Sequence, residues 1–240
     1  MKTLHQDAPA PSAAAVRLSR LFPLGAPALA ALAAAEDAPR HLRARAELAT
    51  EGKPAGTPKL ILHGWAARMR VLPDGRRHLL SFLLPGDLLG LTRRPRPLAP
   101  VTVVALTELA WCVAPAADAF PDLAAAYATS RALEEAHLLA TIVRLGRLHA
   151  VERIADLLLE LHERLDLAGL VEGGGFALPL TQEGLADALG LTAVHVNRMV
   201  QVMRRAGDLS WTGGRMTLCD PAALARRLGR PPTRVSAGAG

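Results

Sequence analysis

The sequence predicts an α+β protein with a small β domain, one long helix and a C-terminal helix-turn-helix. Short apolar runs separated by Gly, Pro and Asp occupy roughly residues 40–115, as strands and turns do. Residues 122–147 contain no Pro and repeat apolar side chains in steps of three and four, which is helical spacing. Two short amphipathic segments joined by a Gly-containing turn follow after residue 178 and predict a DNA-binding motif.

The composition restricts the class of protein. The chain has 240 residues, of which 50% are apolar and only 3% aromatic, so its core must consist mainly of Leu, Ala and Val. The net charge of +6 is compatible with a nucleic-acid partner but is weak support on its own. The apolar stretch Gly25–Ala35 is too short to span a bilayer and begins too late for a signal peptide. We therefore expect a cytoplasmic protein without a membrane partner.

The β domain is predicted from short runs bounded by turn residues. We expect strands over residues 60–62, 65–72, 78–84, 101–106 and 109–113. Pro73-Asp74-Gly75 is typical of the tight turn of a β-hairpin. Strands at this regular spacing predict a small β sandwich or roll. A short helix over residues 29–35 precedes them, and the first 15 residues have the composition of a disordered arm.

Residues 122–147 are predicted to form one amphipathic helix about 39 Å long. Its apolar stripe needs a partner, which is either the β domain of the same chain or the same helix of a second subunit; we favour the homodimer. A further helix is predicted over residues 151–167. The stripe consists of Ala132, Ala136, Leu138, Leu139, Ile142, Val143 and Leu145.

The sequence provides little support for a metal site, a phosphate-binding loop or an enzyme active site. Cys112 and Cys219 lie far apart, which excludes a zinc ribbon or a four-cysteine iron–sulfur cluster within one chain. The connector Gly169–Gly175 lacks the Gly-Lys-Ser/Thr ending of a phosphate-binding loop, so we predict a flexible loop there. The sequence contains no nucleophile–base pair or carboxylate pair in a recognisable motif, and we predict neither an enzyme nor a metal site.

The segment after residue 178 predicts a winged helix-turn-helix. Thr181 caps a first helix, Gly190 ends it in a tight turn, and Thr192 caps a second helix over residues 193–206. Two short strands around Gly213-Gly214 then form a hairpin, the wing. The alternative is an ordinary helical hairpin with a solvated polar face, but the full order of caps, turn, basic face and wing is specific.

The outward face of the second helix fits the chemistry of DNA. Arg198 can bond bidentately to guanine, and His195 and Asn197 can reach base edges in the major groove. Basic side chains further along the motif are better placed for phosphates, which position a protein without reading sequence. These phosphate contacts are Arg204, Arg205 and Arg215, and the remaining predicted DNA contacts are Thr181, Gln182, Thr192, Val194 and Gln201.

Three motifs resemble the cyclic-AMP-receptor/FNR (Crp/Fnr) family of bacterial transcription regulators, over roughly residues 28–222. The first runs from Gly64-Trp65-Ala66 to Pro85-Gly86-Asp87-Leu88-Leu89-Gly90 and is similar to the sensor of that family. The second is Glu152-Arg153-Ile154-Ala155-Asp156-Leu157-Leu158, at the start of the DNA-binding domain. The third ends in Val194-His195-Val196-Asn197-Arg198 and is the most specific.

The resemblance implies a cyclic-nucleotide-binding-like β-roll (a double-stranded β-helix), a long dimerisation helix and a C-terminal winged helix-turn-helix. We accordingly expect a disordered arm over residues 1–15, the sensor over 16–120, and the dimerisation helix and hinge over 121–148. The DNA-binding domain would cover residues 149–225 and a flexible tail 226–240. The implied function is transcription regulation by a homodimer on a palindromic site in double-stranded DNA, with RNA polymerase as a further partner of an activator.

The sensor departs from relatives that bind cyclic nucleotides. Ala99-Pro100 stands where they carry the Arg-Ser pair that grips the phosphate, and Leu138 and Leu139 replace polar helix positions that meet the base. We therefore expect no tight binding of cyclic AMP. The cysteine cluster of oxygen sensors is absent, and a haem held by His78 or His137 is also not expected. The candidate effector pocket comprises Arg68, Leu84, Gly86, Asp87, Leu88, Ala99, Pro100, Leu138 and Leu139.

Several alternatives stay open from the sequence. The sensor either responds to another effector, for instance an anion held by Arg93, Arg94 and Arg96, or has lost its ligand altogether. A cyclic-nucleotide-binding module that acts on protein partners is a further alternative, against which the helix-turn-helix argues. Ala193-Val194 replaces an Arg-Glu pair that many relatives carry early in the recognition helix, so we expect the operator to differ from the common family site.

Overall fold

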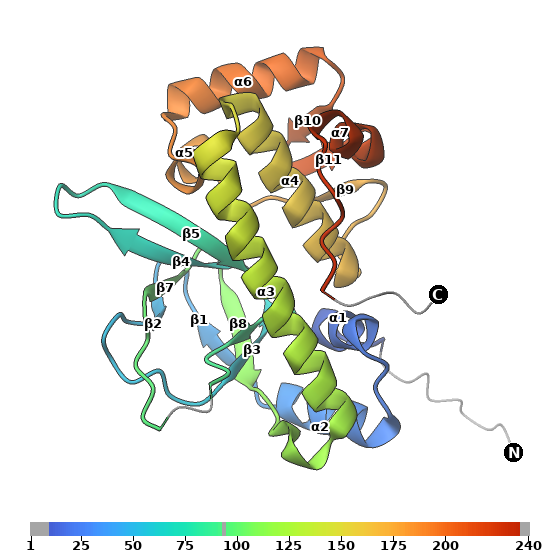
Figure 1. Ribbon diagram of the computed structural model, residues 1–240. Coiled ribbons are helices and arrows are strands. Elements are labelled where there is room, and N and C mark those ends of the chain that lie inside the picture. Colours follow the sequence, from blue (N-terminus) through green and yellow to red (C-terminus); the bar gives the residue numbers. More distant parts are fainter. Residues whose placement is uncertain (1–9, 93–94, 236–240) are drawn as a thin grey trace, which may run out of the picture.

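A computed structural model shows residues 10–92 and 95–235, the part of the chain that the structure describes. Two helices, α1 (Ala13–Leu21) and α2 (Ala26–Glu36), precede a β-roll. The long helix α3 (Pro121–Arg147) runs from the roll towards the C-terminal domain, which begins with α4 (Ala150–Leu167) (Figure 1). This order of β domain, long helix and helix-turn-helix confirms the predicted fold class.

Two antiparallel four-stranded sheets form the roll, with strand orders β1-β8-β3-β6 and β2-β7-β4-β5. Side chains from both sheets fill the interior between them, where Ile61, Leu83, Val103 and Trp111 are buried. The strands are β1 (Arg40–Leu42), β2 (Glu47–Ala49), β3 (Lys59–His63), β4 (Ala66–Val71), β5 (Arg77–Leu83), β6 (Leu88–Leu89), β7 (Thr102–Ala105) and β8 (Leu109–Val113). A short 3₁₀ turn, η1 (Ala117–Ala119), leads into α3.

The hairpin of β4 and β5 forms as predicted, and its side chains pack in the cores of both domains. Gly75 in its turn has a φ of 84°, which a residue without a Cβ adopts easily. Successive side chains of a strand point to opposite faces. Ala66 and Leu83 therefore point into the roll, whereas their neighbours Ala67 and Phe82 join the apolar core of the C-terminal domain.

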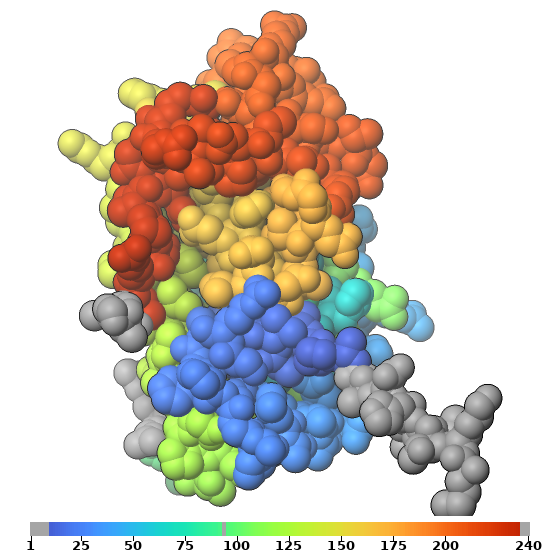
Figure 2. Space-filling model, turned by 90° about the vertical axis from the view of Figure 1, so that its right-hand side faces the viewer, coloured from blue at the N-terminus to red at the C-terminus, as the bar shows by residue number. Residues whose placement is uncertain are grey.

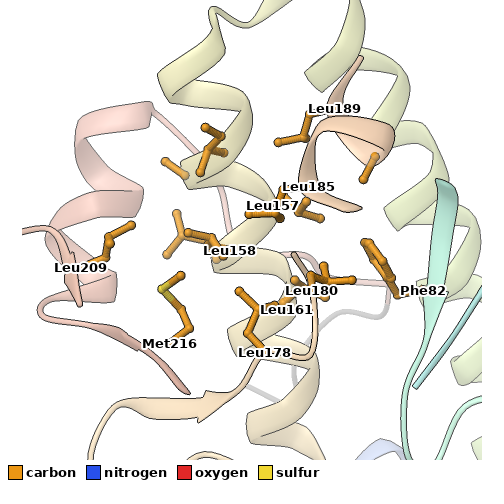
Figure 3. Close-up of a cluster of buried hydrophobic side chains, with 14 of the residues drawn as sticks. Phe82, Leu157, Leu158, Leu161, Leu178, Leu180, Leu185, Leu189, Leu209 and Met216 are labelled. Carbon is orange, nitrogen blue, oxygen red and sulfur yellow. The ribbon is translucent and has the colours of Figure 1, made fainter. Parts of the chain in front are cut away.

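The C-terminal domain is built around α4. Its side chains Leu157, Leu158 and Leu161 form one apolar cluster with the helix-turn-helix and with Phe82 of the roll (Figure 3). Full burial of such a side chain contributes roughly 1.5–3 kcal/mol to stability, so this shared cluster binds the two domains together. The remaining elements are β9 (Gly175–Ala177), α5 (Gln182–Leu189), α6 (Ala193–Arg205), β10 (Leu209–Thr212), β11 (Arg215–Leu218) and α7 (Pro221–Leu228).

The predicted disordered arm (residues 1–15) and flexible tail (residues 226–240) each include residues that belong to a helix. Helix α1 already begins at Ala13, because the Ser12 hydroxyl caps it by accepting from the N–H of Ala15. At the other end α7 continues to Leu228, and Arg230 forms an ion pair with Asp156 at 2.8 Å. Residues 1–9 and 236–240 lie outside the described residues.

The predicted flexible connector Gly169–Gly175 is wrong at its end, where Gly175 begins strand β9. This strand pairs with β11, so the wing sheet has three strands in the order β10-β11-β9. A Cβ at Gly175 would lie 2.7 Å from the hydroxyl of Thr217, which explains a glycine in a strand. Because glycine has little strand propensity, β9 could not be predicted from its residues.

Candidate functional site

The two helices of the DNA-binding motif are held by caps at the predicted positions. The Thr181 hydroxyl accepts from the N–H of Gly184 at 3.1 Å, and the Thr192 hydroxyl accepts from the N–H of His195 at 3.2 Å. Gly190 ends α5 with a φ of 63°, in the left-handed region. These contacts fix the turn between α5 and α6, so that α6 extends along the end of the molecule opposite the roll (Figure 1).

One face of α6 is buried and the opposite face is exposed. Val196, Val200 and Met203 lie in the apolar cluster of the domain. The exposed side chains follow helical spacing and form a single surface, which we call the reading face: Val194, Asn197, Arg198, Gln201, Arg204 and Arg205. Of the other predicted contacts, Thr181 and Thr192 are exposed at the helix starts, whereas Gln182 and His195 are half-buried. The reading face is polar and cationic, as a surface for nucleic acid must be.

Two arginines predicted to contact phosphates have partners within the protein. Arg204 donates to the carbonyl oxygen of Trp211 in β10 at 2.8 Å, which ties the recognition helix to the wing. Arg215 donates to the carbonyl oxygens of Glu172 and Gly175, so its guanidinium holds the wing against β9. Arg205 is exposed in the last turn of α6. The geometry therefore favours Arg205 over Arg215 as a phosphate contact.

A chain of ion pairs, mostly buried, joins the roll to the DNA-binding domain and was not predicted from the sequence. Arg164 of α4 lies 2.6 Å from the Asp87 carboxylate in the roll and 3.1 Å from Glu160. Asp87 also pairs with Arg17 of α1 at 3.0 Å, and Glu160 pairs with Arg144 of α3 at 2.5 Å. The contacts alternate in sign over eight residues, the ion-pair chain: Arg17, Asp87, Arg164, Glu160, Arg144, Asp156, Arg230 and Glu163.

Further hydrogen bonds hold these charged groups, although the buried Nε of Arg164 lacks a partner among the described residues. Arg17 donates to the carbonyl oxygen of Gly86 at 2.9 Å and to the Ser130 hydroxyl at 3.1 Å. Arg164 donates to the carbonyl oxygen of Phe82 at 2.8 Å. Figure 2 shows α1, α4 and the C-terminal segment side by side on one face of the molecule. The ion-pair chain links five parts of the sequence: α1, the turn before β6, α3, α4 and the segment after α7.

The pKa values of the buried carboxyl groups reflect their arginine partners. Burial alone would raise the pKa of Asp87, but Arg164, Arg17 and the N–H of Leu84 hold it below its ordinary value. Burial would likewise raise the pKa of Glu160, and Arg164 and Arg144 lower it instead. Both carboxylates are thus ionised at neutral pH and stabilise the two-domain arrangement in that form.

A small polar cavity of about 30 Å³ lies where β5, α1, α3 and α4 meet. Arg68 crosses it, pairing with Glu134 of α3 and donating to the Ser81 hydroxyl at 3.1 Å. His137 also lines it, and burial together with the nearby Arg164 lowers the pKa of its imidazole to about 4. The imidazole is therefore neutral at physiological pH. Ligand sites commonly measure roughly 300–1,000 Å³, so this cavity is much smaller than a typical ligand site.

The structure gathers only part of the predicted effector-pocket residues around this cavity. Arg68, Asp87, Leu88 and Leu138 line the cavity. Leu84 is buried in the apolar cluster instead, and Leu139 points away and is 58% exposed. The other three do not line it either: Gly86 accepts from Arg17, Ala99 pairs through its backbone with Gly52 and Lys53, and Pro100 is exposed. Arg96 is exposed, and Arg93 and Arg94 lie outside the described residues.

Across residues 10–92 and 95–235, no group of three or more His, Cys, Asp or Glu side chains could hold a metal ion. No helix within the same ranges has the length and apolar character needed to cross a membrane.

Comparisons with known proteins agree with this geometry. Residues 39–127 match the model of the cyclic nucleotide-binding domain, and residues 152–227 match the Crp-like helix-turn-helix domain. The nitrogen fixation regulation protein FixK of Bradyrhizobium diazoefficiens is 32% identical over 168 residues, which cover 68% of this chain and 70% of that protein. The transcriptional activator protein FnrL of Cereibacter sphaeroides is 33% identical over 180 residues, covering 70% of this chain and 71% of FnrL.

Solved structures extend the likeness to the whole fold. The structure of FixK2 from Bradyrhizobium japonicum matches with a TM-score of 0.67 at 28% identity, covering 79% of this chain and 96% of that chain. A roll of the cyclic-nucleotide-binding type joined to a Crp-like helix-turn-helix defines a DNA-binding transcription regulator. The chain belongs to the Crp/Fnr family.

Replacing Arg164 with Met should destabilise the protein by about 3–5 kcal/mol, because Asp87 and Glu160 would stay buried without their shared cation. The free energy of unfolding, measured by urea denaturation, tests this. Arg76→Met is the matched control, since Arg76 pairs with Asp74 on the surface, where solvent screens the two charges and little stability should be lost. Equal losses in the two variants would contradict a structural role of the ion-pair chain.

Proposed function

We propose that the protein acts as a homodimer that binds a palindromic DNA operator through α6 and the wing. The observation that carries this proposal is the reading face, an exposed and cationic surface on a helix capped at its start by Thr192 and tied to the wing near its end by Arg204. Side chains on the N-terminal half of such a helix reach base edges in the major groove, so Asn197 and Arg198 are the proposed base contacts. We assign phosphate contact to Arg205 and a supporting role to Arg204 and Arg215.

The proposed dimer contact is the apolar stripe on α3. Leu139, Ile142 and Val143 are 58%, 68% and 56% exposed, and Leu138 adjoins them. Side chains three and four positions apart lie on one face of a helix, so these four form a continuous apolar surface. A contiguous apolar surface on a long helix is typical of a contact between subunits. Two subunits paired in this way present two recognition helices to one DNA site, and a two-fold axis between them requires a palindrome.

We further propose that the sensor does not bind cyclic AMP. A cyclic phosphate needs a cationic partner and backbone donors, whereas Ala99 and Pro100 offer no such side chain. The interior of the roll is filled by Trp111 and other apolar side chains, and the Arg68–Glu134 pair occupies the space beside α3. A regulator of this kind responds to another effector or acts without one. It would work in the cytoplasm, with RNA polymerase as its partner if it activates transcription.

A second candidate, a module that regulates protein partners through a cyclic-nucleotide-binding fold, lacks a supporting observation. Such a module has no need for a capped recognition helix with a basic exposed face. Arg204 also ties the wing strands to α6, and a module of that kind does not need this contact. The reading face therefore favours the DNA-binding function.

Replacing Ile142 with Glu should convert the dimer into a monomer, because the contact would then bury an unpaired charge. We expect association at least about tenfold weaker, measured by sedimentation velocity over a range of concentrations. Val71→Glu is the matched control, since Val71 is 56% exposed on the β4–β5 hairpin, away from α3. A dimer that survives Ile142→Glu unchanged would refute the proposed contact.

Selection from random duplex DNA at fixed salt should yield a palindromic site. Its affinity for the purified protein should be the same with and without cyclic AMP, because the sensor lacks the groups that hold the phosphate. Fluorescence anisotropy on the labelled site measures both affinities. A marked gain with cyclic AMP would overturn the proposed loss of nucleotide binding, and failure to select any sequence would count against the DNA-binding function itself.

Two arginines on the reading face should behave differently on the selected site. Arg198→Ala should cost about 1–3 kcal/mol of binding free energy and relax the preference at one base position in each half-site. Arg205→Ala should weaken all sequences alike and lower the salt slope of binding by about 1 for each subunit. Affinities for single-base variants of the site at several salt concentrations distinguish the two. Equal loss of discrimination would contradict this division of roles.

A further inference from the structure

Val194 is an apolar side chain whose position is not explained by packing within the protein. It lies in the first turn of α6, next to the cap at Thr192, and is 81% exposed, the highest value among the exposed large apolar side chains of the described residues. A β-branched residue lowers helix propensity slightly, so an exposed helix position gains nothing from it. Folding therefore does not explain Val194, and binding is the alternative.

The neighbours of Val194 restrict what its partner can be. Asn197 and Arg198 follow one turn later, and Gln201 follows two turns later on the same face. All three side chains are exposed and can form hydrogen bonds to polar or negatively charged groups. A partner that meets this surface must carry a small apolar group among hydrogen-bonding and negatively charged groups. The major groove of DNA has this chemistry, because the C5 methyl of thymine lies among base edges between two rows of phosphates.

We infer that Val194 packs against the C5 methyl group of one thymine in each half-site and so specifies that base. This inference rests on the proposed function of α6 as the recognition helix. Val194 precedes Arg198 by four residues, a rise of about 6 Å along the helix. Base pairs are about 3.4 Å apart, so the thymine lies within about two base pairs of the guanine bonded by Arg198.

Deoxyuridine lacks only the C5 methyl group of thymine and provides a direct test. Each thymine of the selected operator is replaced by deoxyuridine, symmetrically in both half-sites, and the affinity of the full-length protein is measured by fluorescence anisotropy. At one position we expect a loss of about fourfold per half-site, or about 15-fold for the dimer. Fourfold corresponds to roughly 0.8 kcal/mol, the burial free energy of one such group.

Variants assign that loss to one side chain. Val194→Ala should bind the thymine and deoxyuridine operators equally well, because the apolar contact is gone. Val202→Ala is the control, since Val202 is also exposed on α6 but two turns further on, and it should keep the full discrimination. Both positions are on the surface, and unchanged thermal unfolding verifies that each variant folds.

The outcomes separate this inference from the function on which it rests. If Val194→Ala keeps the preference for thymine, or if no thymine of a tightly bound operator is sensitive, Val194 does not read a methyl group and the DNA-binding function stands. If the protein selects no sequence at all, the DNA-binding function fails and the inference fails with it. If only Val194→Ala removes the preference for thymine, the inference holds.

Discussion

The pairing of Arg164 with Asp87 and Glu160 is the interaction on which the arrangement of the two domains depends. The guanidinium belongs to the DNA-binding domain, whereas Asp87 and the carbonyl oxygen of Phe82 belong to the roll. The apolar cluster around Phe82 supplies most of the free energy that joins the domains, but apolar contacts tolerate displacement. A shift of α4 along the roll would leave buried charges without partners, so the ion-pair chain fixes one position.

The same chain explains why α1 belongs to the folded protein. Arg17 extends under the turn at Gly86, where a Cβ would lie 2.8 Å from the arginine side chain. Only a glycine allows this approach, and its φ of 87° is one that other residues rarely adopt. Sensor, long helix and DNA-binding domain all contact α1 or its arginine, so a displacement at one of these elements is felt at the others.

Local sequence signals made the DNA-binding motif predictable, whereas contacts between residues far apart in the sequence could not be predicted. Thr181, Gly190 and Thr192 act within one or two turns of chain, and their roles can be deduced from neighbouring residues. Arg17 and Asp87 are far apart in sequence, and no local pattern distinguishes a buried arginine from an exposed one. The lining of the small cavity was only partly predicted for the same reason. The resemblance gives positions along the chain, but packing decides that Leu84 enters the core while Leu139 faces outward.

The apolar core shared by roll and helix-turn-helix limits how such a regulator can evolve. Domains are exchanged easily when their interface is small and polar, so that either partner remains soluble alone. Here Leu79 and Phe82 of the roll are buried against α4 and α5, and exchange of the sensor would leave those helices with an apolar surface in water. Substitution inside the roll is a more accessible route of change. Trp111 and its neighbours can change there while the outer surface that carries the DNA-binding domain is preserved.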